Sequence, residues 1–136
     1  MIVGFNINSI KARTNTDNVN GEISVNSAPV IIDVERKDVD ELKDILSIKF
    51  TFKVEYKPDA GEIKIEGEVL YKSENSKDIL KKWKDTKTLP SDVAVDVLNG
   101  VFRGCLIKAV SLSGDLRLPP PVRFPIVAKE PRSEKE

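Results

Sequence analysis

One stretch near the carboxyl-terminal end constrains the fold more than any other: residues 90–114, PSDVAVDVLNGVFRGCLIKAVSLSG. Pro90 suits the first turn of a helix, where its missing N–H costs nothing, and Gly114 is of the kind that commonly follows a last turn. The stretch is therefore predicted to form a single helix, roughly 35 Å long at 1.5 Å per residue. Such a helix is long for a chain of 136 residues.

This helix is predicted to be apolar around most of its circumference. Polar side chains share one narrow stripe at 100° per residue, and the rest of the surface is apolar or small. A helix of this kind is buried on more than one side, whereas a single sheet covers only one. We therefore expect a second subunit to cover the remainder; a central helix wrapped by its own chain is the alternative. The expected oligomer interface consists of Val97, Gly100, Val101, Gly104 and Lys108.

The balance of charge argues against a general polyanion-binding protein. The chain has 22 Lys plus Arg and 22 Asp plus Glu, and a polyanion binder needs a basic excess. Residues 76–87 are predicted to form a short helix with Trp83 and several lysines, which suggests either a nucleic-acid patch or a solvated helix pinned by one Trp. Interleaved acidic residues favour the solvated helix, so no nucleic-acid partner is expected. Charges also interrupt every run long enough to span a bilayer, so no membrane insertion is expected.

The sequence offers no catalytic site. It contains no histidine and a single cysteine, Cys105, which removes His-activated nucleophiles and nearly excludes structural zinc. Asp92 and Asp96 form an i, i+4 carboxylate pair, but a solvated helix face explains them. We expect no enzyme activity, no metal and no cofactor. The first residues do not have the pattern of a signal peptide, so we expect a cytoplasmic protein.

Several extended segments precede the two helices. Strict alternation over residues 48–57 and again over 62–71, joined by turn residues, predicts a hairpin. Residues 2–14 alternate more loosely and are predicted to form a first strand. Residues 22–35 are extended but interrupted at 26–29, where Pro29 indicates an edge, a bulge or a crossing between pairings. Residues 36–44 are polar and are predicted to form a turn or a short helical turn.

The carboxyl-terminal end is proline-rich. Residues 115–127, DLRLPPPVRFPIV, are predicted to run extended and to pack along the body of the domain; a ligand for a partner's groove is the alternative. Residues 128–136 have a composition typical of a disordered tail. We therefore expect one domain over residues 1–127, followed by that tail.

Three features resemble the SecB family of bacterial export chaperones and its archaeal and toxin–antitoxin-associated relatives. They are the interrupted segment NSAPVIIDVE, the hairpin SIKFTFKVEYKPDAGEIKIEGEVLY, and the helix that ends in DLRLPPPVRFPIV. The resemblance implies an α+β fold, a four-stranded antiparallel sheet with a short helix and a long C-terminal helix packed on one face. It also implies a homotetramer built as a dimer of dimers through the long helices.

The resemblance further implies an ATP-independent holdase that binds unfolded or extended polypeptides in apolar grooves. An adaptable apolar groove can serve many client sequences. The candidate groove residues are Val30, Ile31, Ile32, Leu116, Leu118, Val122, Phe124 and Ile126. Ordinary core packing is the alternative for each of them. The chain lacks the acidic excess of the export members, so delivery to the export motor is not carried over.

Two other functions stay open. A module with one dedicated partner, such as an antitoxin-associated or assembly subunit, would use the same fold and the same apolar surfaces. A small-molecule enzyme or binding protein would need convergent polar groups in a pocket, and the sequence offers no such cluster.

Overall fold

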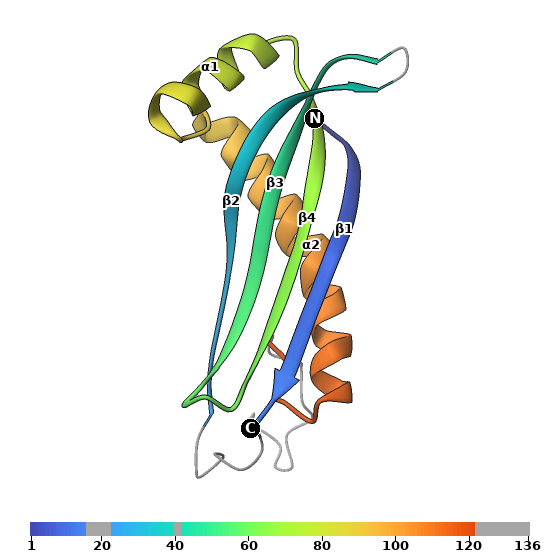
Figure 1. Cartoon of the computed structure of the whole chain (residues 1–136), viewed down its shortest axis with the longest axis vertical. Coiled ribbons are helices and arrows are strands. Elements are labelled where there is room, and N and C mark those ends of the chain that lie inside the picture. Colours follow the sequence, from blue (N-terminus) through green and yellow to red (C-terminus); the bar gives the residue numbers. More distant parts are fainter. Residues whose placement is uncertain (16–22, 40–41, 122–136) are drawn as a thin grey trace, which may run out of the picture.

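The computed structural model describes residues 1–15, 23–39 and 42–121 and contains one four-stranded sheet and two helices (Figure 1). All neighbouring strands are antiparallel, in the order β1-β4-β3-β2, and α2 runs along one face of the sheet while α1 lies at one end. The predicted α+β fold class is confirmed. The elements are β1 (Ile2–Thr14), β2 (Ser24–Val39), β3 (Leu42–Lys57), β4 (Gly61–Lys72), α1 (Ser76–Thr86) and α2 (Ser91–Asp115).

Strands β2 and β3 are longer than their sequence pattern predicts. Of the alternatives predicted for Pro29, the edge is confirmed, whereas pairing continues through residues 26–29 with Pro29 opposite Phe52. Proline is tolerated there since β2 is an edge strand, one side of which needs no donor. The turn predicted over residues 36–44 is wrong for residues 36–39 and 42–44, which belong to strands, whereas residues 40–41 lie outside the described residues. Arg36 pairs with Leu46, so cross-strand pairing carries this polar segment into the sheet.

The core lies between α2 and the sheet face that it covers. Alternate residues of β3 and β4 point toward α2, as the strict alternation predicts, and Phe52 has no exposed surface. The buried residues of α2 recur at every fourth position, a spacing that drifts around the helix and lets it cross the twisted sheet obliquely. They are Val93, Val97, Val101, Cys105, Ala109 and Ser113.

Cys105 is part of this core. Its thiol is fully buried, and burial raises the pKa of the thiol to about 12. Because the thiolate is the reactive form, this cysteine packs as a small apolar residue and is chemically inert in the folded protein.

The residues expected at a subunit interface serve packing within the chain instead. Val97 and Val101 have no exposed surface, so they offer nothing to a second subunit while the fold is intact. A Cβ atom on Gly104 would lie 2.6 Å from the Phe5 ring of β1, and one on Gly100 would overlap Ile2. The two glycines therefore let α2 approach β1 closely. Of the five expected residues, Lys108 alone is classed as exposed.

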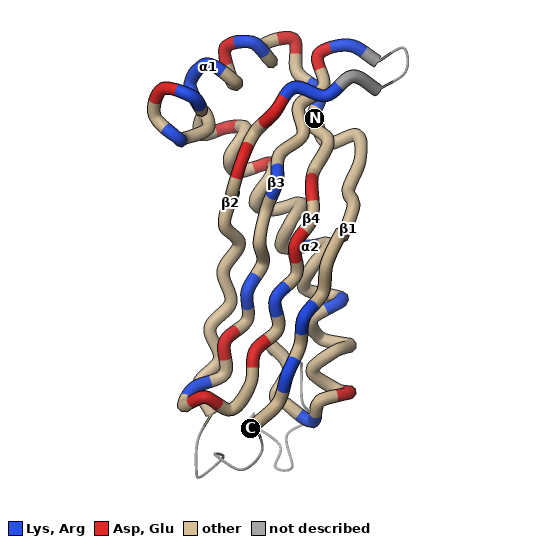
Figure 2. The backbone as a smooth tube through the Cα atoms, viewed as in Figure 1, with Lys and Arg blue, Asp and Glu red and all other residues tan. Residues whose placement is uncertain are grey.

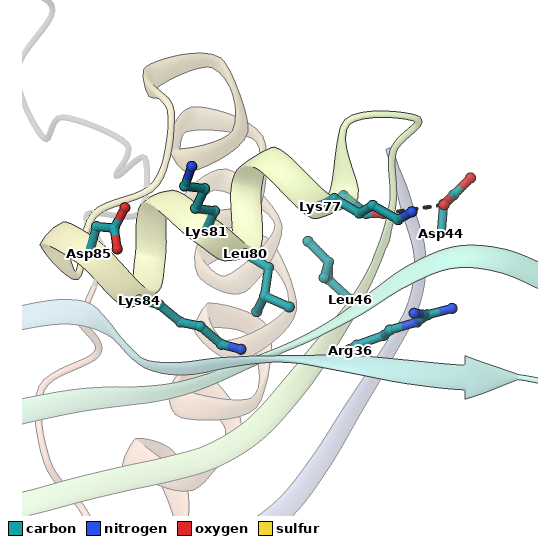
Figure 3. Close-up of a pocket in the computed structure, with 9 residues that line it drawn as sticks. Arg36, Asp44, Leu46, Lys77, Leu80, Lys81, Lys84 and Asp85 are labelled. Carbon is teal, nitrogen blue, oxygen red and sulfur yellow. Dashed lines mark hydrogen bonds between the residues drawn. The ribbon is translucent and has the colours of Figure 1, made fainter.

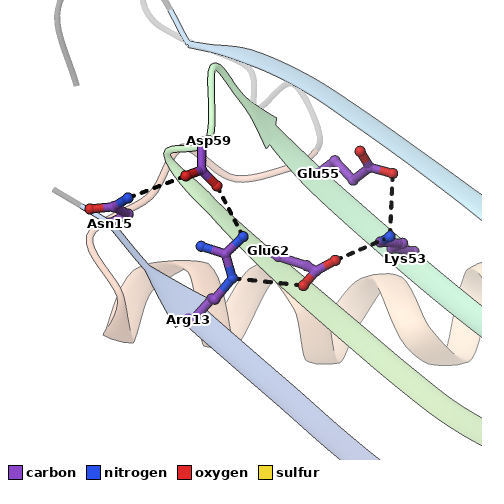
Figure 4. Close-up of polar contacts among 6 residues, drawn as sticks. All are labelled: Arg13, Asn15, Lys53, Glu55, Asp59 and Glu62. Carbon is purple, nitrogen blue, oxygen red and sulfur yellow. Dashed lines mark hydrogen bonds and ion pairs between the residues drawn. The ribbon is translucent and has the colours of Figure 1, made fainter. Parts of the chain in front are cut away.

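The opposite face of the sheet is polar and carries several ion pairs. At one end of the strands, Arg13 lies 3.1 Å from Asp59 and 3.8 Å from Glu62, while Lys53 contacts Glu62 at 3.2 Å and Glu55 at 3.7 Å (Figure 4). These pairs are solvent-exposed, so each contributes little to stability.

Glu68 is the best-connected carboxylate on that face. It accepts hydrogen bonds from the Ser47 hydroxyl at 2.6 Å, from Lys37 Nζ at 2.9 Å and from Asn6 Nδ2 at 3.3 Å. The Ser47 hydroxyl, followed by the Lys37 ammonium, holds the pKa of the Glu68 carboxyl below its usual value. The ionised form is stabilised by folding for this reason.

A pH dependence of stability follows. A lowered folded-state pKa means that the stability contributed by Glu68 is complete above the unfolded-state value of about 4.3 and is lost as the pH falls through the folded-state value. We expect Ser47→Ala to raise the pKa of Glu68 and to weaken that acid dependence. NMR titration of the Glu68 carboxyl, with urea unfolding from neutral to acidic pH, measures both effects. An unchanged pKa in the variant would contradict this assignment.

Candidate polypeptide-binding site

Two large apolar side chains are exposed next to each other on the edge strand β2. Val30 is 52% exposed and Ile32 is 55% exposed, whereas Ile31 between them is half-buried against the core. Val30 pairs with Thr51 and Ile31 with Phe50, and the next pair joins Asp33 to Lys49. Ile32 is therefore the extra residue of a β-bulge. The bulge explains how three consecutive apolar residues leave two of them at the surface.

This edge is unusual because it carries no charge along much of its length. Residues 24–32 of β2 contain no Lys, Arg, Asp or Glu (Figure 2). Edge strands present unpaired N–H and C=O groups, and charged side chains are the common protection against pairing with other chains. Here Pro29 and the bulge at Ile32 interrupt continuous pairing instead. The edge therefore disfavours a long added strand but leaves its apolar side chains available to a short extended segment.

A groove adjoins β2 at its other end, beneath α1 (Figure 3). Its volume is about 310 Å³, at the small end of the range for ligand pockets. Leu46 and Leu80 supply its apolar lining, and Leu46 is almost fully buried. The charged residues around it are Arg36, Asp44, Lys77, Lys81, Lys84 and Asp85. Among the residues that line the groove, cationic side chains outnumber carboxylates by four to two.

Sequence reasoning missed this groove. Lys77, Lys81 and Lys84 recur at i, i+4 and i+7, which places them on one face of α1. That spacing was the signal in the sequence that could have indicated a basic helix face. The strand residues that complete the groove, on β2 and β3, lie more than 30 positions earlier and could not be assigned to it. The expectation of a helix pinned by Trp83 agrees with the structure, since Trp83 is 6% exposed. Its ring is not available to stack on a nucleotide base.

The candidate groove residues do not converge on one surface. Leu118 is 7% exposed and lies against Gly61, where a Cβ atom would be 2.7 Å from Leu118 Cδ1. Gly61 pairs with Tyr56, five residues along β3 from the partner of Val30, or about 17 Å. Leu116 is half-buried against the core. Leu118 and Ile31 therefore pack as core residues. Val122, Phe124 and Ile126 lie outside the described residues.

A second, more polar pocket of about 340 Å³ lies between the starts of both helices and the end of β4. Tyr71 lines it and donates a 3.2 Å hydrogen bond to Asp96; burial, followed by this carboxylate, raises the pKa of the Tyr71 hydroxyl. Within the described residues, no group of His, Cys, Asp or Glu is arranged to hold a metal ion. None of the helices in the described part is both long enough and apolar enough to cross a membrane.

The architecture has a counterpart among solved structures. The chain is similar to the Mycobacterium tuberculosis Rv1957 SecB-like chaperone, solved in complex with a ChAD peptide from the Rv1956 HigA1 antitoxin. The TM-score is 0.58 over 94% of this chain and 89% of that chain, at 13% sequence identity. The chain has a SecB-like fold. No protein-family model and no curated protein sequence matches it.

The SecB-like fold was expected from the order of elements, and the similarity confirms it at the level of architecture. The bound peptide belongs to the Rv1957 complex. At 13% identity the residues that bind it there are not transferred to this chain. The surfaces of this chain therefore have to be judged by their own exposure and charge.

Proposed function

We propose that this protein is an ATP-independent chaperone that binds extended apolar segments of unfolded polypeptides. The observation that carries the proposal is the exposure of Val30 and Ile32 on an uncharged stretch of an edge strand. An unfolded client offers apolar side chains and unpaired backbone groups, and this edge offers both in return. The SecB-like fold supports the same reading. The proposed setting is the cytoplasm, without ATP or another cofactor.

The size of the apolar edge implies more than one copy. Burying a large aliphatic side chain contributes about 1.5–3 kcal/mol, so two half-exposed side chains together contribute about the same amount. A millimolar dissociation constant already requires about 4 kcal/mol. One subunit would therefore hold a client weakly, whereas linked copies raise the apparent affinity through effective concentration.

We further propose that the copies form a homotetramer built as a dimer of dimers. The outward side of α2 is the candidate contact, because Val95 is 58% exposed and Ile107 is 75% exposed on it. These exposed residues take the place, in the proposed interface, of Val97 and Val101, which the sequence pattern had suggested and which are buried. The mass in solution, by multi-angle light scattering, tests the assembly. A monomer at micromolar concentration would contradict it.

Val30→Thr combined with Ile32→Thr tests the binding edge. Threonine keeps the branched Cβ that suits a strand but replaces the exposed apolar surface with a hydroxyl. We expect the double variant to bind an unstructured apolar peptide about tenfold more weakly, because the apolar contribution is lost. It should also fail to suppress aggregation of unrelated unfolded proteins. Fluorescence anisotropy and light scattering of heated clients are the measurements.

Ile10→Thr is the matched control for that experiment. Ile10 is 40% exposed and belongs to β1, the opposite edge strand. We expect it to leave both readouts near wild type. Full chaperone activity in the Val30→Thr/Ile32→Thr variant would contradict the proposed edge. A wild-type protein that suppresses aggregation of none of several clients would contradict the proposed function.

A dedicated partner is the second candidate function. The observation in its favour is that the solved neighbour, Rv1957, is in complex with a peptide from one antitoxin. In that case the same apolar edge would bind one peptide segment, and unrelated unfolded proteins would not compete for it. A single protein recovered in stoichiometric amount, together with no effect on generic clients, would favour this function over the holdase.

A further inference from the structure

Three lysines of α1 line the groove beneath that helix. Three lysines of the described sheet are paired: Lys37 with Glu68, Lys49 with Glu35, and Lys53 with Glu55 and Glu62. By contrast, Lys77, Lys81 and Lys84 line the groove and form no ion pair with any residue in the described part of the chain. Figure 3 shows Lys84 pointing toward the strands, Lys77 extending toward Asp44, and Lys81 pointing away from Leu46 and Leu80.

The groove and the apolar edge belong to one continuous strand. Ile32 and Arg36 are both on β2, four residues apart, which corresponds to about 13 Å along an extended chain. An extended segment that lies along this edge over Val30 and Ile32 therefore comes alongside Arg36 within about four of its own residues. The groove then meets a defined position of the bound segment.

We propose that the groove beneath α1 binds carboxylate side chains of the client, so that the protein prefers segments in which Asp or Glu lies about four residues from an apolar run. This inference rests on the proposed polypeptide-binding function and adds the chemistry of the preferred client. Ammonium groups near an apolar lining complement an acidic side chain with an aliphatic stem. In this proposal the basic groove discriminates between client segments, and the apolar edge supplies binding that is independent of charge.

An acidic peptide fits this groove better than a nucleic acid does. Asp44 and Asp85 stand among the cations and would repel a continuous run of phosphates, whereas a single carboxylate can avoid them. The aromatic residue of α1, Trp83, is buried and cannot stack on a base. The chain has no excess of basic residues, which also disfavours binding of a nucleic acid.

Two fluorescent twelve-residue peptides test the preference. Both carry a central Val-Ile-Val run, one with Glu four residues away on each side and the other with Gln at the same two positions. Placing the residues on both sides covers either direction of binding. We expect the Glu peptide to bind the wild-type protein about three- to tenfold more tightly, as a few partly exposed ion pairs would allow. The preference should shrink between 50 and 500 mM salt, because salt screens exposed charges.

Variants on one helix assign that preference to the groove. We expect Lys77→Gln/Lys81→Gln/Lys84→Gln to bind both peptides alike, at the wild-type affinity for the Gln peptide. Lys82→Gln is the matched control, since Lys82 is on the same helix but lines the other pocket. It should keep the preference. All four lysines are exposed, so circular dichroism should show an unchanged fold.

The outcomes separate the two proposals. Equal binding of both peptides by the wild-type protein, with the loss caused by Val30→Thr/Ile32→Thr intact, would overturn the carboxylate site and leave the proposed function standing. Binding of neither peptide would overturn both. A short single-stranded oligonucleotide that binds more tightly than the Glu peptide, and that loses this binding in the triple lysine variant, would assign the groove to nucleic acid and overturn the inference.

Discussion

Gly67→Val is expected to lower the free energy of unfolding by about 3 kcal/mol. Gly67 lies in β4, opposite Ile7 of β1 and Phe50 of β3. A Cβ atom there would overlap the Asn6 carbonyl oxygen and would lie 2.9 Å from Phe50 Cζ. The carbonyl belongs to the backbone of a paired strand, so it cannot move without disrupting the β1–β4 ladder. Overpacking of a core costs about 1–3 kcal/mol, and a backbone clash places this site at the upper end.

Urea unfolding followed by circular dichroism measures this loss. Glu66→Val is the matched control, because it introduces the same side chain at the neighbouring residue, which faces the polar side of the sheet. We expect a change within about 0.5 kcal/mol for the control. If Gly67→Val were as stable as the wild-type protein, the close approach of β1 to β4 at this position would be wrong.

Gly104→Leu is expected to destabilise the subunit itself by about 2 kcal/mol. The added side chain would meet the Phe5 ring, whose nearest atom lies 2.6 Å from an ideal Cβ on Gly104. Phe5 is stacked on Phe50 with ring centroids 5.4 Å apart, so the ring is held on both sides. The estimate combines an overpacking cost of about 3 kcal/mol with a gain of about 0.8 kcal/mol from replacing glycine in a helix.

Gly114→Leu is the control on the same helix. Nothing lies within 4 Å of a Cβ atom there, so we expect this variant to be as stable as the wild-type protein or slightly more stable. Urea unfolding gives the stabilities, and light scattering gives the mass. A Gly104→Leu variant with full stability but a smaller mass would show that the glycine lies at a subunit interface, as the sequence pattern alone had suggested.

The elements themselves were accessible from the sequence. The period of two in residues 48–57 and 62–71 predicted the central hairpin, and the apolar run between Pro90 and Gly114 predicted α2 within one residue at each end. These patterns are local: a strand or a helix repeats every two or about 3.6 residues wherever it packs. The resemblance of their order to the SecB family was enough to predict the architecture.

The roles of individual residues were decided by the tertiary structure. Gly100 and Gly104 read as an interface motif in sequence, but in the structure they receive Ile2 and Phe5 of a strand about 100 residues earlier. The extension of β2 through the polar residues 36–39 likewise depends on pairing with β3. A local sequence pattern does not indicate which distant segment a residue will pack against.

The candidate site shows the same division. The run Val30-Ile31-Ile32 marked a surface segment from sequence, whereas the bulge that exposes Ile32 depends on its register with β3. The lysines of α1 were visible at helical spacing, but the groove exists only because α1 packs across Arg36 and Leu46. Periodicity determines which elements form and which faces are apolar. Contacts between distant segments determine which apolar and charged residues remain exposed, because burial is a property of the packed chain rather than of its local composition.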